Sequence, residues 1–202
     1  MQPDMPATVI LASSSRYRRE LLSRLNIPFE TESPSIDESP HADESPKETS
    51  IRLAREKAKA VGKNHPNAII IGSDQVAECN GTPIGKPLSF ERAMDQLRFM
   101  RGKEVLFHTA LCVLDGKNGE ALQETVITTT VAFRNLPDEE LASYLMIEKP
   151  FDCAGSAKNE GLGITLLEKI ESNDPTALTG LPLIALTSML RNCGITFFAG
   201  GK

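Results

Sequence analysis

The chain has 202 residues, with 22 Lys and Arg against 27 Asp and Glu and therefore a formal net charge of −5. With about 150 residues to a typical domain, residues 1–202 are expected to form a single domain. The 40% hydrophobic content excludes a disordered chain, and the acidic balance argues against a general nucleic-acid coat, which needs a basic face to neutralise phosphates. A small anionic ligand needs only a local cluster of cations and stays open.

Cysteine spacing and apolar segments bear on the compartment. The four cysteines show no CxxC or zinc-finger spacing and are too few for a disulfide scaffold. No Lys or Arg precedes Arg16, which argues against a signal peptide. The most apolar later stretch, residues 181–190, is about half as long as the roughly 20 residues that span a membrane. We therefore expect a cytoplasmic protein that does not enter a membrane.

Strand and helix patterns alternate in the first half of the chain. Apolar runs at 8–12 and 68–73 predict strands buried on both faces, and the second is expected to end at Asp74. Ser45-Pro46-Lys47-Glu48 is a capping box with proline at the first helical position, which predicts a helix to about Gly62. We also expect a helix at 16–25, a strand at 27–32 and a polar stretch at 33–45.

The helix expected at 16–25 begins with three cations, Arg16, Arg18 and Arg19. Positive charge is unfavourable there, because the helix macrodipole favours acids at an N-terminus. A bound anion would remove the conflict, and three solvated arginines are the alternative interpretation.

Hairpin strands and helices are mixed in the second half. Asn80-Gly81 predicts a hairpin turn, and β-branched alternation favours two long strands joined by a DGKNG turn. In chain order we expect a helix from Ser89 to about Met100, strands at 105–114 and 120–133, a helix between Pro137 and Pro150, a glycine-punctuated segment at 152–163, a strand at 164–170 and a helix from about Pro182 to just before Gly194. The pattern indicates an α/β protein with a mixed sheet flanked by helices.

Three short segments place polar groups next to predicted strands, where α/β sheets bind ligands. Residues 13–19 (SSSRYRR) combine hydroxyls, free backbone N–H groups and guanidinium groups, which a triphosphate requires, although an ordinary capped helix looks similar. Asp74 in Gly72-Ser73-Asp74-Gln75 could hold a divalent metal or activate a water, or simply cap a turn. Gly85-Lys86-Pro87 presents a fixed lysine, for which an ordinary surface position is the alternative.

In their order along the chain, these segments resemble the Maf family of nucleoside triphosphate pyrophosphatases. The motifs that carry the resemblance are SSSRYRR, Asp37-Glu38, RLAREKA at 52–58, GSDQ, GKP, Phe151-Asp152-Cys153-Ala154-Gly155, Glu160-Gly161-Leu162-Gly163 and Gly180-Leu181-Pro182. Each motif is weak alone, but the ordered set is specific and extends from about Val9 to Leu190. The resemblance implies an ITPase-like fold with two lobes around a central cleft.

The family resemblance also implies a reaction, in which a nucleoside triphosphate and water give the monophosphate and pyrophosphate with a divalent metal, Mg²⁺ or Mn²⁺. Asp74 matches the catalytic proton acceptor, and Glu38 and Asp74 are the expected metal ligands, since hard cations prefer oxygen. Lys57, Arg18 and Lys86 match cationic positions that would neutralise the triphosphate, and Lys57 and Glu38 are expected to act in catalysis beside Asp74. The substrate-binding residues expected on this basis are Ser13, Ser15, Arg18 and Lys86. For Lys57 a solvated helix lysine is the alternative.

Base preference depends on three further positions, Tyr17, Gln75 and Glu160. They resemble the 7-methyl-GTP pyrophosphatase subgroup rather than the subgroup that prefers dTTP and UTP. An aromatic ring such as Tyr17 stacks well on the positively charged 7-methylguanine, and the Glu160 carboxylate can accept from the guanine N1–H and amine. The alternatives are a core tyrosine and a surface glutamate.

The sequence departs from the subgroup pattern at two positions, and two other functions have to be considered. Arg16 stands where proline is usual in the subgroup, and Cys153 where other members often have lysine. A nucleotide-binding regulator of septum formation is the alternative function, although the carboxylates of Glu38 and Asp74 would repel a triphosphate without a metal between them. A phosphomonoesterase lacks its nucleophilic DxD motif. A homodimer is implied by the family resemblance alone.

Overall fold

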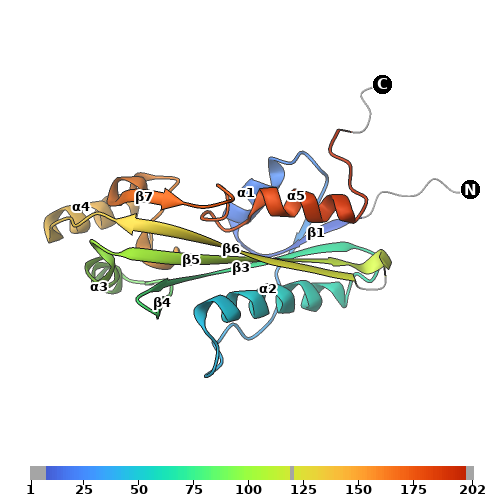
Figure 1. Ribbon diagram of the computed structural model, residues 1–202, viewed down its shortest axis with the longest axis horizontal. Helices are drawn as coiled ribbons and strands as arrows, with labels where there is room; N and C mark the ends of the chain where they lie inside the picture. The colour runs from blue at the N-terminus through green and yellow to red at the C-terminus, as the bar shows by residue number, and fades with distance from the viewer. Residues whose placement is uncertain (1–7, 119–120, 199–202) are drawn as a thin grey trace, which may run out of the picture.

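The computed structural model describes residues 8–118 and 121–198, which form one mixed sheet covered by helices (Figure 1). In these described residues the seven strands are β1 (Val9–Ala12), β2 (Glu30–Glu32), β3 (Ile69–Cys79), β4 (Thr82–Ile84), β5 (Glu104–Asp115), β6 (Ala121–Phe133) and β7 (Leu167–Glu171). The helices are α1 (Arg16–Ser23), α2 (Pro46–Gly62), α3 (Phe90–Met100), α4 (Asp138–Glu148) and α5 (Leu183–Asn192). The predicted mixed α/β fold is confirmed.

Helix boundaries follow the predicted caps closely. The Ser45 and Glu48 capping box closes the start of α2, and Ser89 accepts from the Arg92 N–H at the start of α3. Gly194, with φ of 84°, follows the end of α5 as expected. Asn80 and Gly81 form the β3–β4 turn, whereas Gly119, the last residue of the DGKNG turn, lies outside the described residues.

Three predicted strands differ from the structure. β2 covers only Glu30–Glu32, and the first part of the strand expected at 164–170 is a 3₁₀ turn at Leu162–Leu166. β3 does not end at Asp74 but continues to Cys79. The reason is β5, which pairs antiparallel with β3 from Ile69 through Glu78 and therefore keeps the strand extended.

The other side of β3 is paired in two separate pieces. β1 runs parallel to β3 and its pairing stops at Ala12 opposite Gly72. β4 pairs antiparallel with β3 only from Ala77 to Cys79. Between these two partners, Asp74 and Gln75 lie at an edge where no described strand covers β3. The sheet thus opens a gap at the end of β1, the position at which open α/β sheets bind ligands.

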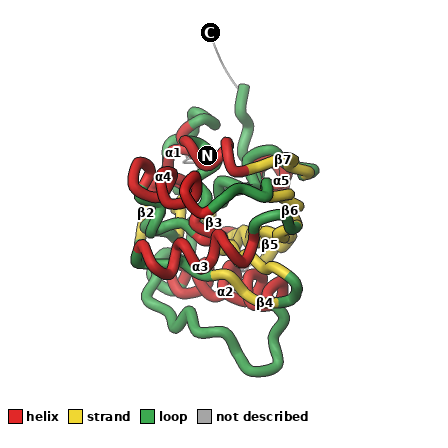
Figure 2. Tube along the Cα trace, turned by 90° about the vertical axis from the view of Figure 1, so that its left-hand side faces the viewer, coloured by secondary structure: helices red, strands yellow, loops and turns green. Residues whose placement is uncertain are grey.

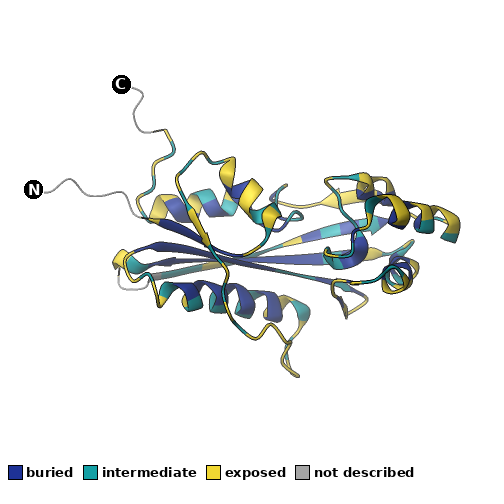
Figure 3. Cartoon of the chain, turned by 180° about the vertical axis from the view of Figure 1, so that it is seen from behind, coloured by how far each residue is buried: buried dark blue, intermediate teal, exposed yellow. Residues whose placement is uncertain are grey.

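The core is divided between the two faces and the two ends of the sheet. α1 and α5 cover one face near β1, and α2 covers the opposite face, while α3 and α4 pack at the far end (Figures 1 and 2). Each helix buries an apolar stripe against the strands, and the middle strands are buried along nearly their whole length (Figure 3). In the described part of the chain, no helix is long and apolar enough to cross a membrane.

Candidate active site

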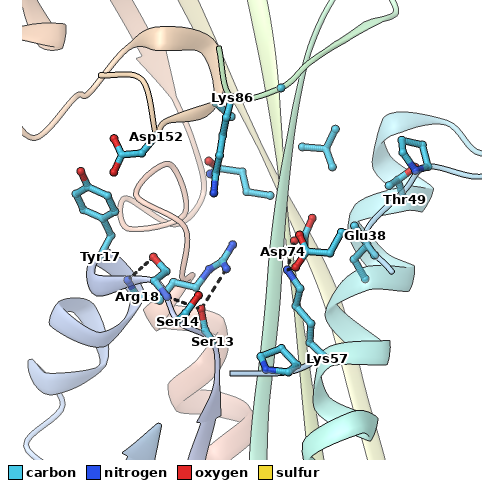
Figure 4. A pocket seen from close by; sticks show the side chains of 18 of the residues that line it. Ser13, Ser14, Tyr17, Arg18, Glu38, Thr49, Lys57, Asp74, Lys86 and Asp152 are labelled. Atoms are coloured by element: carbon cyan, nitrogen blue, oxygen red, sulfur yellow. Dashed lines mark hydrogen bonds and ion pairs between the residues drawn. The ribbon is translucent and has the colours of Figure 1, made fainter. Parts of the chain in front are cut away.

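A cleft of about 720 Å³ opens at the gap beside β3 (Figure 4). A smaller recess of about 160 Å³ shares part of its lining with the cleft. Every residue that the sequence predicts for the site lines one or both of these spaces: Ser13, Ser15, Tyr17, Arg18, Glu38, Lys57, Asp74, Gln75, Lys86 and Glu160. Glu160 borders only the recess, whereas Glu38, Lys57 and Asp74 border only the cleft. The structure therefore brings together segments that are up to about 150 residues apart in the sequence.

Within the lining of the cleft, the Lys57 ammonium bridges two carboxylates. Its Nζ lies 2.7 Å from Asp74 Oδ1 and 3.1 Å from Glu38 Oε1. The Lys57 and Asp74 side chains are 7% and 10% exposed, and that of Glu38 is 58% exposed. Lys57 is therefore not the solvated helix lysine of the alternative interpretation but a buried cation held between two acids.

Close packing of α2 on β3 sets the position of Lys57. A Cβ at Gly72 would collide with the backbone of Ala54 and Ala58 on α2, so a side chain there would push the helix away from the strand. With glycine at this position, α2 lies directly on β3 and its residue Lys57 reaches Asp74, two residues further along the strand.

A salt bridge fixes the loop that carries Glu38. Arg52 on α2 donates to both Glu44 carboxylate oxygens and to the Ser39 carbonyl. These bonds hold the pKa of Glu44 at about 2, well below its usual value. In the Asp37-Glu38 pair only Glu38 faces the cleft, because Asp37 accepts from the Ser39 N–H instead.

The β1–α1 turn arranges hydroxyls and a guanidinium on the opposite side of the cleft. The Ser15 hydroxyl caps α1 by accepting from the Arg18 N–H, and the Ser13 hydroxyl accepts from the Ser15 N–H at 3.1 Å. Arg18 Nε donates to the Gly180 carbonyl at 2.8 Å, and Nη1 contacts the Ser13 hydroxyl at 3.4 Å. Burial lowers the pKa of Arg18, and the charges of Asp74 and Glu38 oppose that shift.

The loop between β7 and α5 supports this side and was not among the predicted site residues. Its Gly180 carbonyl accepts from Arg18 and from the buried Ser73 hydroxyl, the latter at 3.0 Å. Asp174, 1% exposed, accepts from the Ile184 N–H at 2.8 Å and so ties the loop to the start of α5. In the sequence, the one sign of this loop's role is Asp174, an acid shortly before Gly180-Leu181-Pro182.

Tyr17, Gln75 and Glu160 meet around the smaller recess. The Gln75 amide nitrogen lies within 3.0 Å of three acceptors, Thr109 Oγ1 and the carbonyls of residues 177 and 178, which fixes the orientation of the side chain. Tyr17 is half-buried rather than a core residue, and burial raises the pKa of its hydroxyl. Glu160 is exposed to the recess.

Both departures noted in the sequence lie beside Tyr17. The Arg16 guanidinium stacks over the Tyr17 ring at 4.9 Å from its centroid and donates to the Tyr17 hydroxyl at 3.0 Å. Cys153 Sγ lies 3.9 Å from the same hydroxyl, and burial raises the pKa of this thiol to about 11. Opposite them, Asp152 faces the tyrosine and Lys86 points into the cleft from the β4–α3 connection (Figure 4).

Metal-ligand clusters made of protein alone are absent from the described ranges 8–118 and 121–198. No group of three or more His, Cys, Asp or Glu side chains there is arranged to hold an ion. Glu38 and Asp74 supply two carboxylates that already share one cation, the Lys57 ammonium. Such a pair suits Mg²⁺, which is commonly bound through one or two carboxylates together with substrate phosphates and waters.

Comparison with known proteins agrees with the geometry. A family model described as Maf-like protein matches residues 8–193, and the chain belongs to that family. A protein of Cupriavidus metallidurans named 7-methyl-GTP pyrophosphatase is 58% identical over 98% of this chain and 99% of its own length. A protein of the same name from Ralstonia nicotianae is 57% identical over 96% of this chain and all of its own length.

Among solved structures, a HAM1 protein from Coxiella burnetii shares the fold with a TM-score of 0.53. It is 15% identical, and the match covers 92% of this chain and 99% of that chain. The similarity concerns the fold alone.

Proposed function

We propose that this protein is a nucleoside triphosphate pyrophosphatase that hydrolyses 7-methyl-GTP to 7-methyl-GMP and pyrophosphate. The observation that carries the proposal is the buried Lys57 ammonium between Asp74 and Glu38, opposite Arg18 in one cleft. The cations suit an anionic substrate, and the acids between them suit a divalent cation that is bound together with it. The names of the two relatives, each more than half identical over nearly the full chain, support the same activity.

The chemistry is divided between two ends of the cavity. We call Ser13, Arg18, Glu38, Lys57, Asp74 and Lys86 the phosphate end. Asp74 accepts a proton from the water that attacks the α-phosphorus, and the bond from that phosphorus to the pyrophosphate oxygen breaks. Arg18, Lys57 and Lys86 stabilise the negative charge that moves onto the departing pyrophosphate. The hydroxyls of Ser13 and Ser15 border the same space and contribute donors to the phosphates.

A divalent metal, Mg²⁺ or Mn²⁺, fits the phosphate end through Glu38 and Asp74. When bound, it would neutralise phosphate charge between two acids that otherwise repel the substrate. Lys57 contacts both carboxylates and holds them on the same side of the cleft in the absence of other cations. Removal of the metal with EDTA is therefore expected to abolish turnover, and added Mg²⁺ or Mn²⁺ to restore it.

Tyr17, Gln75 and Glu160, which surround the recess, form what we call the base end. The Tyr17 ring is placed to stack on a cationic base, and the Glu160 carboxylate to accept from the guanine N1–H and amine. Gln75 has its amide nitrogen occupied by three protein acceptors, so its oxygen is the atom left to meet the substrate.

The test is pyrophosphate release from 7-methyl-GTP, GTP, UTP, dTTP, CTP and ATP with Mg²⁺ or Mn²⁺, beside Asp74→Asn. We expect the wild type to prefer 7-methyl-GTP strongly and Asp74→Asn to lose this turnover. Preference for UTP or dTTP would keep the reaction and overturn the specificity. Tight binding without turnover of any nucleotide would favour the regulator of septum formation. The expected homodimer also stays a prediction, which the mass measured by light scattering tests.

A further inference from the structure

The base end depends on a short segment with little regular structure of its own. Residues 156–162 carry Glu160 between two 3₁₀ turns, Ala154–Ser156 and Leu162–Leu166. The Glu160 side chain is exposed to the recess and has no hydrogen-bond or salt-bridge partner within the described residues. Whatever orients Glu160 must therefore act through the backbone on either side of it.

One carboxylate on α4 binds this segment on both sides of Glu160. Glu148 Oε1 accepts from Lys158 Nζ at 2.8 Å, and Glu148 Oε2 accepts from the Leu162 N–H at 2.8 Å. The Glu148 side chain is 12% exposed. Lys158 and the Leu162 N–H together lower the pKa of Glu148, so the group stays ionised at neutral pH. Glu160 thus lies in a loop whose two ends are tied to one anion.

Gly161 allows Glu148 to approach the loop this closely. A Cβ added at Gly161 would lie 2.6 Å from Glu148 Oε2. A side chain at this position would therefore push the Glu148 carboxylate away from the backbone next to Glu160.

A second α4 side chain holds the start of the same segment. The buried Tyr144 hydroxyl donates to the Ser156 carbonyl and accepts from the Lys158 N–H, each at 3.1 Å. Neither Tyr144 nor Glu148 lines the cleft or the recess. Both can reach a substrate only through the segment that they hold.

We propose that Glu148 is a positioning residue for base recognition, which acts through Glu160. This inference rests on the proposed function, because it assigns Glu148 a role in the recognition of guanine. Within the described residues, the hydrogen bonds and the ion pair of Glu148 go to Lys158 and Leu162 and not to the phosphate end, so loss of Glu148 weakens binding of the base and leaves binding of the phosphates unchanged.

The experiment separates the two halves of the ligand. Dissociation constants are measured for 7-methyl-GMP, UMP and inorganic tripolyphosphate with the wild type, Glu148→Ala, Glu160→Gln and the double variant. Glu140→Ala, an exposed acid on the same helix, is the matched control. We expect Glu148→Ala to weaken 7-methyl-GMP binding by about tenfold, with tripolyphosphate binding within about twofold of the wild type. In the double variant, Glu148→Ala should add little to the loss caused by Glu160→Gln.

Other outcomes overturn one proposal or the other. Independent, additive losses in the double variant, or equal losses for 7-methyl-GMP and tripolyphosphate, would show that Glu148 acts on the whole fold and not through Glu160. A wild type that binds UMP as tightly as 7-methyl-GMP would instead overturn the proposed function. If Glu148→Ala does not fold, Glu148→Gln keeps the volume and one acceptor for the Leu162 N–H but loses the charge opposite Lys158. The same non-additivity with Glu160→Gln is then expected.

Discussion

The phosphate end and the base end are built in different ways. At the phosphate end, Lys57 and Asp74 belong to long regular elements, α2 and β3, whose neighbouring side chains form the buried core beneath them. At the base end, Glu160 lies between two 3₁₀ turns and is held by a few bonds from α4. The packed sheet and helix therefore position the charged groups Lys57 and Asp74 at one end, whereas a loop held by α4 positions Glu160 at the other.

This difference indicates which property of the protein a substitution at each end will change. Backbone in a packed sheet and helix resists displacement, because any shift costs contacts throughout the core. A loop held by a few side-chain bonds can be altered with little effect on the rest of the fold. We therefore expect substitutions at the phosphate end to remove turnover or stability, and substitutions at the base end to alter selectivity with a smaller effect on stability.

The largest effect is expected at Asp74. Asp74→Asn keeps the size of the side chain but removes the group that accepts a proton, so turnover should fall by about 10² to 10⁴-fold. Nucleotide binding should persist, because the cations and hydroxyls of the cleft are retained. Single-turnover kinetics together with equilibrium binding measure the two quantities separately. A variant that retains most of its turnover would exclude Asp74 as the proton acceptor.

Two glycines, one at each end, compare the packing directly. Gly72→Ala should lower the free energy of unfolding by about 3 kcal/mol, because the new methyl group meets α2 backbone that cannot move alone. Gly161→Ala should lower it by about 1 kcal/mol, because the methyl group meets the end of the Glu148 side chain, which can turn away. Urea denaturation of both variants checks the difference. Equal losses of stability would contradict the comparison.

The sequence predicts the phosphate end better than the base end for the same physical reason. Buried strands and capped helices leave local patterns, and these patterns placed β1 and α2 within one or two residues. The ordered motifs then indicated Asp74 and Lys57. The continuation of β3 past Asp74 was missed, because it depends on pairing with β5, and pairing partners distant in the sequence leave no local pattern.

At the base end, the resemblance indicated Glu160, but no periodicity could indicate what holds it. Tyr144 and Glu148 look like ordinary members of α4, and their partners in the loop lie 10 to 14 residues further along the chain. Side-chain bonds between a helix and a loop have no repeating spacing. Only the three-dimensional structure shows them.

Glu160→Gln should change base selectivity by about ten- to a hundredfold. The reason is the loss of charge-assisted hydrogen bonds to the guanine N1–H and amine, which contribute about 1.5–3 kcal/mol. Ratios of kcat/KM for guanine and uracil triphosphates measure the change, with pyrophosphate as the product throughout. An unchanged ratio would remove Glu160 from the recognition of the base.

A smaller effect is expected from the Tyr17 ring. Tyr17→Ala should reduce the preference for 7-methyl-GTP over GTP by about three- to thirtyfold, because a cationic base loses its aromatic partner. Tyr17→Phe keeps the ring and serves as the control, with most of the preference retained. Equal reduction of turnover for the two nucleotides in Tyr17→Ala would contradict stacking.

The smallest effect concerns Arg16, the cation that stacks on the same ring. Its guanidinium lies 4.9 Å from the ring centroid and binds the Tyr17 hydroxyl, so it competes with a positively charged base for the electrons of the ring. Arg16→Gln should therefore raise the preference for 7-methyl-GTP over GTP by about two- to threefold. Arg19→Gln removes an exposed cation from the same helix and corrects for the general effect of charge on triphosphate binding. A preference that falls in Arg16→Gln would mean that Arg16 supports the ring in its stacking position, and the base end would then be held by its neighbours along α1 as well as by α4.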